Sequence, residues 1–320
     1  MRVAAVTIRA MTDAIVLSGV RKSFGDKQAV RGLDLVVPRG ALYGVIGPNG
    51  AGKSTSLRMI LSILFPDEGR IEVLGEDSAL KAKDRIGYLP EERGVYRKMP
   101  VAAFLLHMAI LKGLRRDEAR RRVDQWLSRV GLAEVAKKKC EELSKGMQQK
   151  IQFIAAVIHG PELLILDEPF SGLDPVNMRL LRDLILDEHR RGTTILFSTH
   201  VMHQAEQLCE HIVRLHDGRK VLDDTLAIVR ARHVPRALRF EPLQGDADVP
   251  AALAMVPDVL GVTRQEGHYR IDLAEGARLD AVVQAVAARV APSRLELLRP
   301  SLEDIFIDIV SHGGTQEATP

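Results

Sequence analysis

The chain has 320 residues, and 45 Lys and Arg against 42 Asp and Glu give it a formal net charge of +3. Apolar residues make up 46% and charged residues 27%, which is the balance of an ordinary folded protein and excludes intrinsic disorder and a small disulfide-stapled fold. The two cysteines, Cys140 and Cys209, lie far apart without a CxxC partner, so we expect reduced thiols rather than a disulfide or metal site. No apolar run reaches the roughly 18 residues of a transmembrane helix, and the richest stretch, 151–166, is interrupted by Gln152 and His159.

Strand and helix patterns alternate from Asp13 to residue 230, which predicts a largely parallel sheet with crossover helices. Apolar runs that end in Gly or Pro predict strands at 14–17, 33–37 and 71–74, and more uniformly apolar runs predict fully buried strands at 42–46, 163–166 and 194–197. Helical spacing predicts helices over 101–130 and 178–191, and Asp217-Gly218 predicts a hairpin turn. Residues 1–12 are interpreted as an N-terminal extension, with Met11 as an alternative start.

The composition changes after residue 230. Residues 231–250 contain Pro235, Pro242 and Pro250 and are interpreted as a linker into a second unit. From residue 237 onward the pattern is strand, helix, strand, strand, helix, strand, which predicts a split βαβ or ferredoxin-like α+β domain. We therefore expect an accessory, regulatory or dimer-stabilising domain over 235–311 and a disordered tail over 312–320.

A glycine-rich loop follows the expected strand at 42–46. Its sequence, Gly47-Pro48-Asn49-Gly50-Ala51-Gly52-Lys53-Ser54-Thr55, fits the pattern GxxxxGK[ST]. Glycines let such a loop wrap a phosphate with its N–H groups pointing inward, and the helix that follows adds its positive end. We expect Lys53 to neutralise the β- and γ-phosphates and Ser54 to offer its hydroxyl to Mg²⁺. The alternative is a glycine-rich turn with an exposed lysine, and the strand before and the helix-forming residues after the loop argue against it.

Two carboxylates, Asp167 and Glu168, end the apolar run at 163–166. The carboxyl ends of strands are where open α/β sheets bind ligands, and this end belongs beside the phosphate-binding loop. Asp167 suits Mg²⁺, directly or through water, and Glu168 suits a general base that polarises the attacking water. The alternative is a solvated turn, which the upstream loop makes less favourable.

With these motifs in place, the chain resembles the nucleotide-binding subunit of an ABC transporter. Residues 143–147, LSKGM, resemble the LSGGQ signature, with Lys145 in place of a glycine and Met147 in place of a glutamine. The resemblance implies that Ser144 and Gly146 contact the γ-phosphate of an ATP bound by the other subunit, whereas alone Ser144 is a helix N-cap. It also implies that Asp174, in Ser171-Gly172-Leu173-Asp174, reaches across the dimer and that His200 is the switch histidine on the γ-phosphate.

Two further positions are matched by place in the chain. Phe24 stands where the family has an aromatic side chain that stacks on adenine, and a buried core phenylalanine is the alternative. Glu91, in Tyr88-Leu89-Pro90-Glu91, stands where the family has a glutamine that senses Mg²⁺ and links to the membrane subunit. A glutamate can ligate Mg²⁺ through oxygen, but when ionised it cannot donate a hydrogen bond.

The stretch YLPEERGVY and the closing SLEDIF, residues 301–306, resemble a subgroup of ABC-2-type exporter subunits that includes sodium-export (NatA-like) proteins. This resemblance implies a RecA-like P-loop core over 13–230 with antiparallel β and helical subdomains. It implies an ATPase that uses ATP and Mg²⁺, pairs with itself or another ATPase subunit, and powers a separately encoded permease at the cytoplasmic face of the inner membrane.

Two other functions remain open from the sequence. One is an ABC ATPase that acts on ribosomes or DNA, although such proteins carry tandem cassettes or long coiled-coil insertions and this chain has neither. The other is an ATP-switched regulatory protein, against which the full set of catalytic residues argues. Basic clusters at 115–122 and 137–139 are interpreted as solvated helix faces, with contact to anionic headgroups as the alternative. No aromatic platform accompanies them, so nucleic acid is not expected as a partner.

Overall fold

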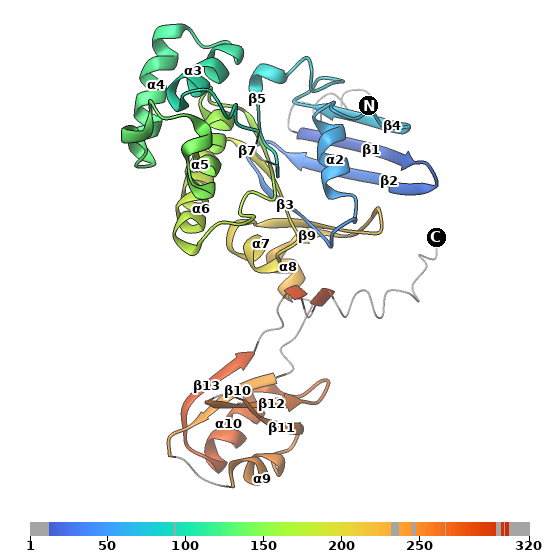
Figure 1. Cartoon of the computed structure of the whole chain (residues 1–320). Coiled ribbons are helices and arrows are strands. Elements are labelled where there is room, and N and C mark those ends of the chain that lie inside the picture. The colour runs from blue at the N-terminus through green and yellow to red at the C-terminus, as the bar shows by residue number, and fades with distance from the viewer. Residues whose placement is uncertain are drawn as a thin grey trace. The chain divides into compact units, whose positions relative to one another are not determined.

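The computed structural model describes residues 13–92, 94–231, 237–244, 248–265, 267–298, 302–303 and 305–306. The expected N-terminal extension and C-terminal tail therefore lie outside the described residues. The chain divides into two compact units, Met1–Leu226 and Ala227–Pro320 (Figure 1). Each unit has its own sheet or sheets, so each is described by itself.

The first unit is built on a six-stranded sheet in the order β5-β6-β7-β3-β8-β9. Its strands are β3 (Leu42–Ile46), β5 (Ile86–Leu89), β6 (Leu163–Asp167), β7 (Thr194–Thr199), β8 (His211–His216) and β9 (Arg219–Thr225). All neighbouring pairs are parallel except β8 and β9, which form the hairpin predicted at Asp217-Gly218. Every residue of β3, β6 and β7 is buried, which confirms these three predicted strands and places their carboxyl ends along one edge of the sheet.

A second sheet in the first unit is antiparallel, in the order β2-β1-β4 (Figure 1). Its strands are β1 (Asp13–Phe24), β2 (Lys27–Pro38) and β4 (Glu68–Val73), and the first two are much longer than the predicted 14–17 and 33–37. The ladder shifts register between Leu17 and Val20, where Gly19 has a φ of +58°, so the alternation that predicts a strand is broken there. The β1–β2 hairpin therefore extends to a turn at Gly25-Asp26, and that turn positions Phe24.

Helices and short 3₁₀ turns complete the first unit. They are α2 (Lys53–Ile60), η1 (Lys83–Arg85), α3 (Val101–Leu111), α4 (Arg116–Arg129), η2 (Ala133–Val135), η3 (Cys140–Glu142), α5 (Lys145–Val157), α6 (Pro175–Arg190), α7 (Met202–Leu208) and, at the boundary, α8 (Leu226–Ala231). The region predicted as helical over 101–130 forms two helices, α3 and α4, because Gly113, at a φ of +86°, ends the first. Among the described residues, no helix is long and apolar enough to cross a membrane.

The second unit contains the predicted strand and helix order. It consists of β10 (Ala237–Pro242), α9 (Val249–Ala254), β11 (Val259–Gln265), β12 (His268–Leu273), α10 (Leu279–Arg289) and β13 (Pro292–Leu298). The antiparallel sheet order β11-β12-β10-β13 is that of a ferredoxin-like domain. The linker interpretation of 231–250 is wrong for 237–242 and 249–250, because Pro242 ends β10 and Pro250 lies in the first turn of α9. Both prolines stand where no backbone N–H is needed by a ladder or helix. Residues 232–236, with Pro235, and 245–247 lie outside the described residues.

Candidate active site

The glycine-rich loop connects β3 to α2 and is tightly enclosed by backbone from β2 and β8. Gly52 has a φ of +100°, and a Cβ there would lie 2.5 Å from the carbonyl oxygen of Ala29. A Cβ on Gly47 would lie 2.3 Å from the carbonyl oxygen of Leu215. Glycine is therefore required at both positions by contact with neighbouring backbone, and the helix N-terminus that follows offers the N–H groups that intrahelical bonds leave free.

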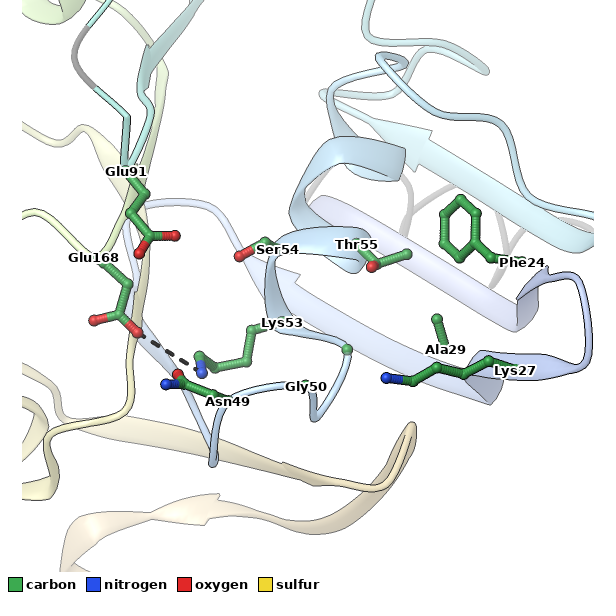
Figure 2. Close-up of a pocket in the computed structure, with 11 residues that line it drawn as sticks. Phe24, Lys27, Ala29, Asn49, Gly50, Lys53, Ser54, Thr55, Glu91 and Glu168 are labelled. Atoms are coloured by element: carbon green, nitrogen blue, oxygen red, sulfur yellow. Dashed lines mark ion pairs between the residues drawn. The ribbon is translucent and has the colours of Figure 1, made fainter.

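Lys53 is buried, with 6% of the residue exposed. Its ammonium Nζ donates to the carbonyl oxygens of Gly47 at 2.8 Å and Pro48 at 3.2 Å, and it lies 3.7 Å from Oε1 of Glu168. The loop thus curls around its own lysine, whose charge is directed to the same space as the Glu168 carboxylate (Figure 2).

This space is a cavity of about 390 Å³. It is lined by Phe24, Lys27, Ala29, Asn49, Gly50, Gly52, Lys53, Ser54, Thr55, Glu91 and Glu168. In Figure 2, Phe24, Lys27 and Ala29 of the β1–β2 hairpin lie on one side of the loop, and Glu91 and Glu168 lie on the other. The cavity therefore has an aromatic ring at one end, carboxylates at the other and an anion-binding loop between them. This arrangement suits a molecule that has a base at one end and phosphates at the other.

The carboxylates at the end of β6 are held by the neighbouring strand. The parallel ladder pairs Asp167 with Ser198 of β7, and Asp167 Oδ1 accepts from the hydroxyls of Ser198 at 2.5 Å and Ser54 at 3.3 Å. Glu168 has a φ of +47°, a left-handed conformation that costs a non-glycine residue free energy and is maintained only where the surroundings enforce it. Its Oε1 lies 2.9 Å from Nδ1 of His200, so the buried carboxylate is oriented by a histidine that is itself half exposed.

Three predicted site residues lie outside both the glycine-rich loop and the ends of β6 and β7, and they do not line this cavity. Ser144 caps α5 by accepting from the N–H of Met147 at 3.3 Å. Asp174 caps α6 by accepting from two N–H groups, at 3.0 Å from Val176 and 2.9 Å from Asn177, and these bonds hold the pKa of its carboxyl below the ordinary value. Gly146 packs against α6, because a Cβ there would lie 2.7 Å from Nδ2 of Asn177.

Comparison with known proteins identifies the family. Residues 30–171 match the model of the ABC transporter family, and residues 225–310 match the C-terminal domain of DrrA1-3-like ATP-binding proteins. An uncharacterized ABC transporter ATP-binding protein of Bacillus subtilis, YhaQ, is 40% identical over 305 residues, which cover 92% of this chain and 98% of that protein. The chain belongs to the ABC transporter ATP-binding proteins.

Relatives named for drug resistance and for Nod factor export are among these matches. The daunorubicin resistance ATP-binding protein DrrA3 of Streptomyces coeruleorubidus is 35% identical over 310 residues, covering 92% of this chain and 95% of that protein. NatA of Bacillus subtilis is 37% identical over 212 residues, covering 64% and 86%, and is one of several relatives at similar identity. A solved ATP-binding subunit of an ABC transporter matches with a TM-score of 0.64 and 31% identity over 68% of this chain and 92% of that one. The chain is the ATP-binding subunit of an ABC transporter, and it hydrolyses ATP to drive transport.

The ATP site of this subunit fits a bound Mg²⁺. Ser54 and Asp167 present a hydroxyl and a carboxylate 3.3 Å apart, and Mg²⁺ prefers such hard oxygen ligands, taking one or two from the protein and the rest from phosphates and water. Among the described residues there is no group of three His, Cys, Asp or Glu side chains that could hold a metal ion. Glu91 also lines the cavity and offers a further carboxylate.

The structure also shows what the sequence reasoning missed. Lys27 lines the cavity beside Phe24. The feature of the sequence that points to it is its position three residues after the candidate aromatic, on the far side of a Gly-Asp turn. Ser198 contacts Asp167, although only His200 of the run Ser198-Thr199-His200 had been singled out. Phe24 itself is 50% exposed, which does not agree with the alternative of a core phenylalanine.

Proposed function

We propose that two subunits close over two ATP molecules, with each subunit completing the site of the other. The observation that carries this proposal is the separation of the motif residues within one chain. Lys53, Ser54 and Glu168 line the cavity, but Ser144 and Asp174 stand exposed at the starts of α5 and α6, away from its lining. If Ser144 and Gly146 contact a γ-phosphate, that phosphate has to belong to a nucleotide held by a partner chain.

Each side chain of the cavity has a distinct role in this proposal. Lys53 exchanges its carbonyl partners in the loop for phosphate oxygens, and Phe24 stacks on the adenine ring. Glu168 is the general base for the attacking water, and His200, at 2.9 Å, orients its carboxylate and reaches the γ-phosphate. Ser54, Asp167 and Glu91 hold Mg²⁺, which neutralises the charge that develops on the phosphates.

A separately encoded permease is the partner that receives the resulting movement. Glu91 joins the cavity to the segment before α3, where Tyr96 is half exposed and packs against Phe104 with ring centroids 5.7 Å apart. Leu111 at the end of α3 is also exposed. Apolar side chains that reach solvent beside a nucleotide-linked segment provide a docking surface for a membrane protein, which would hold this subunit at the cytoplasmic face of the membrane.

The second unit serves as an accessory domain that regulates or stabilises the pair. The cargo is chosen by the permease rather than by this chain. The stretch YLPEERGVY resembles a subgroup of exporter subunits that includes sodium-export proteins, and relatives named for daunorubicin and linearmycin resistance match more than nine-tenths of this chain, so export is the direction we propose. The permease that binds this subunit would therefore identify the cargo class better than the ATP site does.

Glu168→Gln tests the proposal because it preserves the shape of the side chain and removes the base. We expect turnover to fall by about 10²- to 10⁴-fold with ATP affinity retained, and ATP to drive the variant into dimers on size-exclusion chromatography. Glu134→Gln, at an exposed glutamate, is the matched control and should behave as wild type. A tagged, ATP-loaded Glu168→Gln chain should also co-purify a polytopic membrane protein from detergent-solubilised membranes. Near-normal hydrolysis refutes the role of Glu168, and a monomer at saturating ATP refutes the paired sites.

A further inference from the structure

Ser198 links the two carboxylates at the end of β6. It is fully buried at the end of β7, and its hydroxyl donates to Asp167 Oδ1 at 2.5 Å. The same oxygen accepts from the backbone N–H of Glu168 at 3.2 Å. A serine hydroxyl has one proton to donate and two lone pairs, so this single group serves the side chain of one carboxylate residue and the backbone of the next.

The bridge matters because it supplies the shorter of two hydroxyl bonds to the Asp167 carboxylate and one of two bonds to the backbone N–H of Glu168. Asp167 Oδ1 has one other hydroxyl donor, Ser54, at the longer distance of 3.3 Å. In the proposed site Ser54 turns to the metal ion, which leaves Ser198 as the hydroxyl that fixes the Asp167 carboxylate. Glu168 is in the strained left-handed conformation, and within the described part of the chain its N–H donates to the hydroxyl and the carbonyl oxygen of Ser198, each at 3.2 Å.

We infer that Ser198 is a positioning residue of the ATPase site, which aligns Asp167 toward Mg²⁺ and Glu168 toward the attacking water through one hydroxyl. This inference rests on the roles proposed above for Asp167 and Glu168. It does not make Ser198 a catalytic residue, because its hydroxyl is occupied by these two partners. The hydroxyl, rather than the bulk of the side chain, carries the function.

The test removes the hydroxyl and measures turnover and Mg²⁺-dependent binding separately. Ser198→Ala should lower kcat by about 10- to 150-fold, the range for one hydrogen bond to a charged group. In the Glu168→Gln background, which prevents turnover, calorimetry should show that Ser198→Ala leaves ATP affinity without Mg²⁺ within about twofold and reduces the gain in affinity that Mg²⁺ provides. Ser198→Cys keeps the volume with a weak donor and should resemble Ser198→Ala. Ser198→Thr keeps the hydroxyl and should recover most of the turnover and the Mg²⁺ response.

Thr194→Val is the matched control, because Thr194 is also buried on β7 and its hydroxyl accepts from the N–H of Gly40 at the other end of the strand. Removing that hydroxyl should lower the unfolding temperature without changing kcat or the Mg²⁺ response. If Ser198→Ala matches Thr194→Val in both readouts, or if Ser198→Cys retains full turnover, the inference is overturned while the roles of Asp167 and Glu168 stand. If Glu168→Gln itself keeps normal turnover, the proposed function fails and the inference falls with it.

Discussion

Replacing Lys53 by methionine should weaken ATP binding, and the structure bounds the size of the effect. An ammonium has three N–H donors, and two of them are used on the carbonyls of Gly47 and Pro48. Binding therefore exchanges existing hydrogen bonds for charge-assisted ones to phosphate, so the net gain is that of one charged hydrogen bond, about 1.5–3 kcal/mol, rather than of three. At 1.4 kcal/mol for each factor of ten, the Kd for ATP should rise by about 10- to 150-fold.

Calorimetric titration of the full-length chain with ATP and Mg²⁺ measures this change directly. Methionine keeps the unbranched stem, so the buried position stays filled and the unfolding temperature should change little. Lys27→Met is the control, because it removes a second cation from the same cavity at an exposed position, where we expect a rise of at most about fivefold. A Kd for Lys53→Met within about threefold of wild type would refute the phosphate-binding role, and an equal effect at Lys27 would show that only general charge attraction matters.

Two stability predictions concern polar contacts outside the cavity. Asp174→Ala removes the N-cap of α6 and should lower the unfolding temperature by about 2–4 °C. Asp174→Asn keeps a hydrogen-bond acceptor and should keep most of the stability. Any loss of turnover in the asparagine variant therefore reports on the dimer contact instead. Glu162 bonds Arg85, at 2.6 Å and 2.8 Å, and Arg39, and these bonds lower its pKa. Because the pKa of Glu162 is lowered in the folded state, its ionised carboxylate stabilises the fold at pH values above the ordinary glutamate pKa. This stabilisation is lost as the pH falls from there through the lowered pKa. Glu162→Gln should therefore cost at most about 1 kcal/mol in urea unfolding at neutral pH, given the solvent exposure of these side chains, and nothing in strong acid. A cost that persists in strong acid would contradict this reasoning.

Much of the fold was predictable because burial on both faces leaves a continuous apolar run. The runs at 42–46, 163–166 and 194–197 gave three central strands nearly to the residue, and the loops that follow them carry the phosphate-binding motif, the carboxylates and His200. Where one face of a strand meets solvent or a ladder carries a bulge, the pattern was lost. The outer halves of β1 and β2 were therefore missed, and Lys27 with them.

Contacts between segments far apart in the chain could not be predicted, because a motif shows a residue's type and not its partner. Ser198 is 31 residues from Asp167, and only the register of β6 against β7 brings the two together. The short strand β5 was also absent from the prediction, because its four residues, Ile86–Leu89, include Gly87. That glycine is needed in place, since a Cβ would lie 2.1 Å from the carbonyl oxygen of Ala156.

The interior of α5 gives the clearest case of a residue whose meaning depends on the fold. In the sequence, Gln152 only interrupts an apolar stretch. In the structure it is buried and donates to the carbonyl oxygen of Glu92 at 3.0 Å, next to Glu91, while Gln149 on the same helix donates to the carbonyl oxygen of Pro169 at 2.9 Å, next to Glu168. A shift of α5 must therefore either carry both segments along or break both hydrogen bonds. Breaking them is unfavourable, because losing a buried hydrogen bond costs more free energy than losing an exposed one. The helix that begins with the signature residues is thereby tied to both carboxylate-bearing segments of the cavity in its own chain.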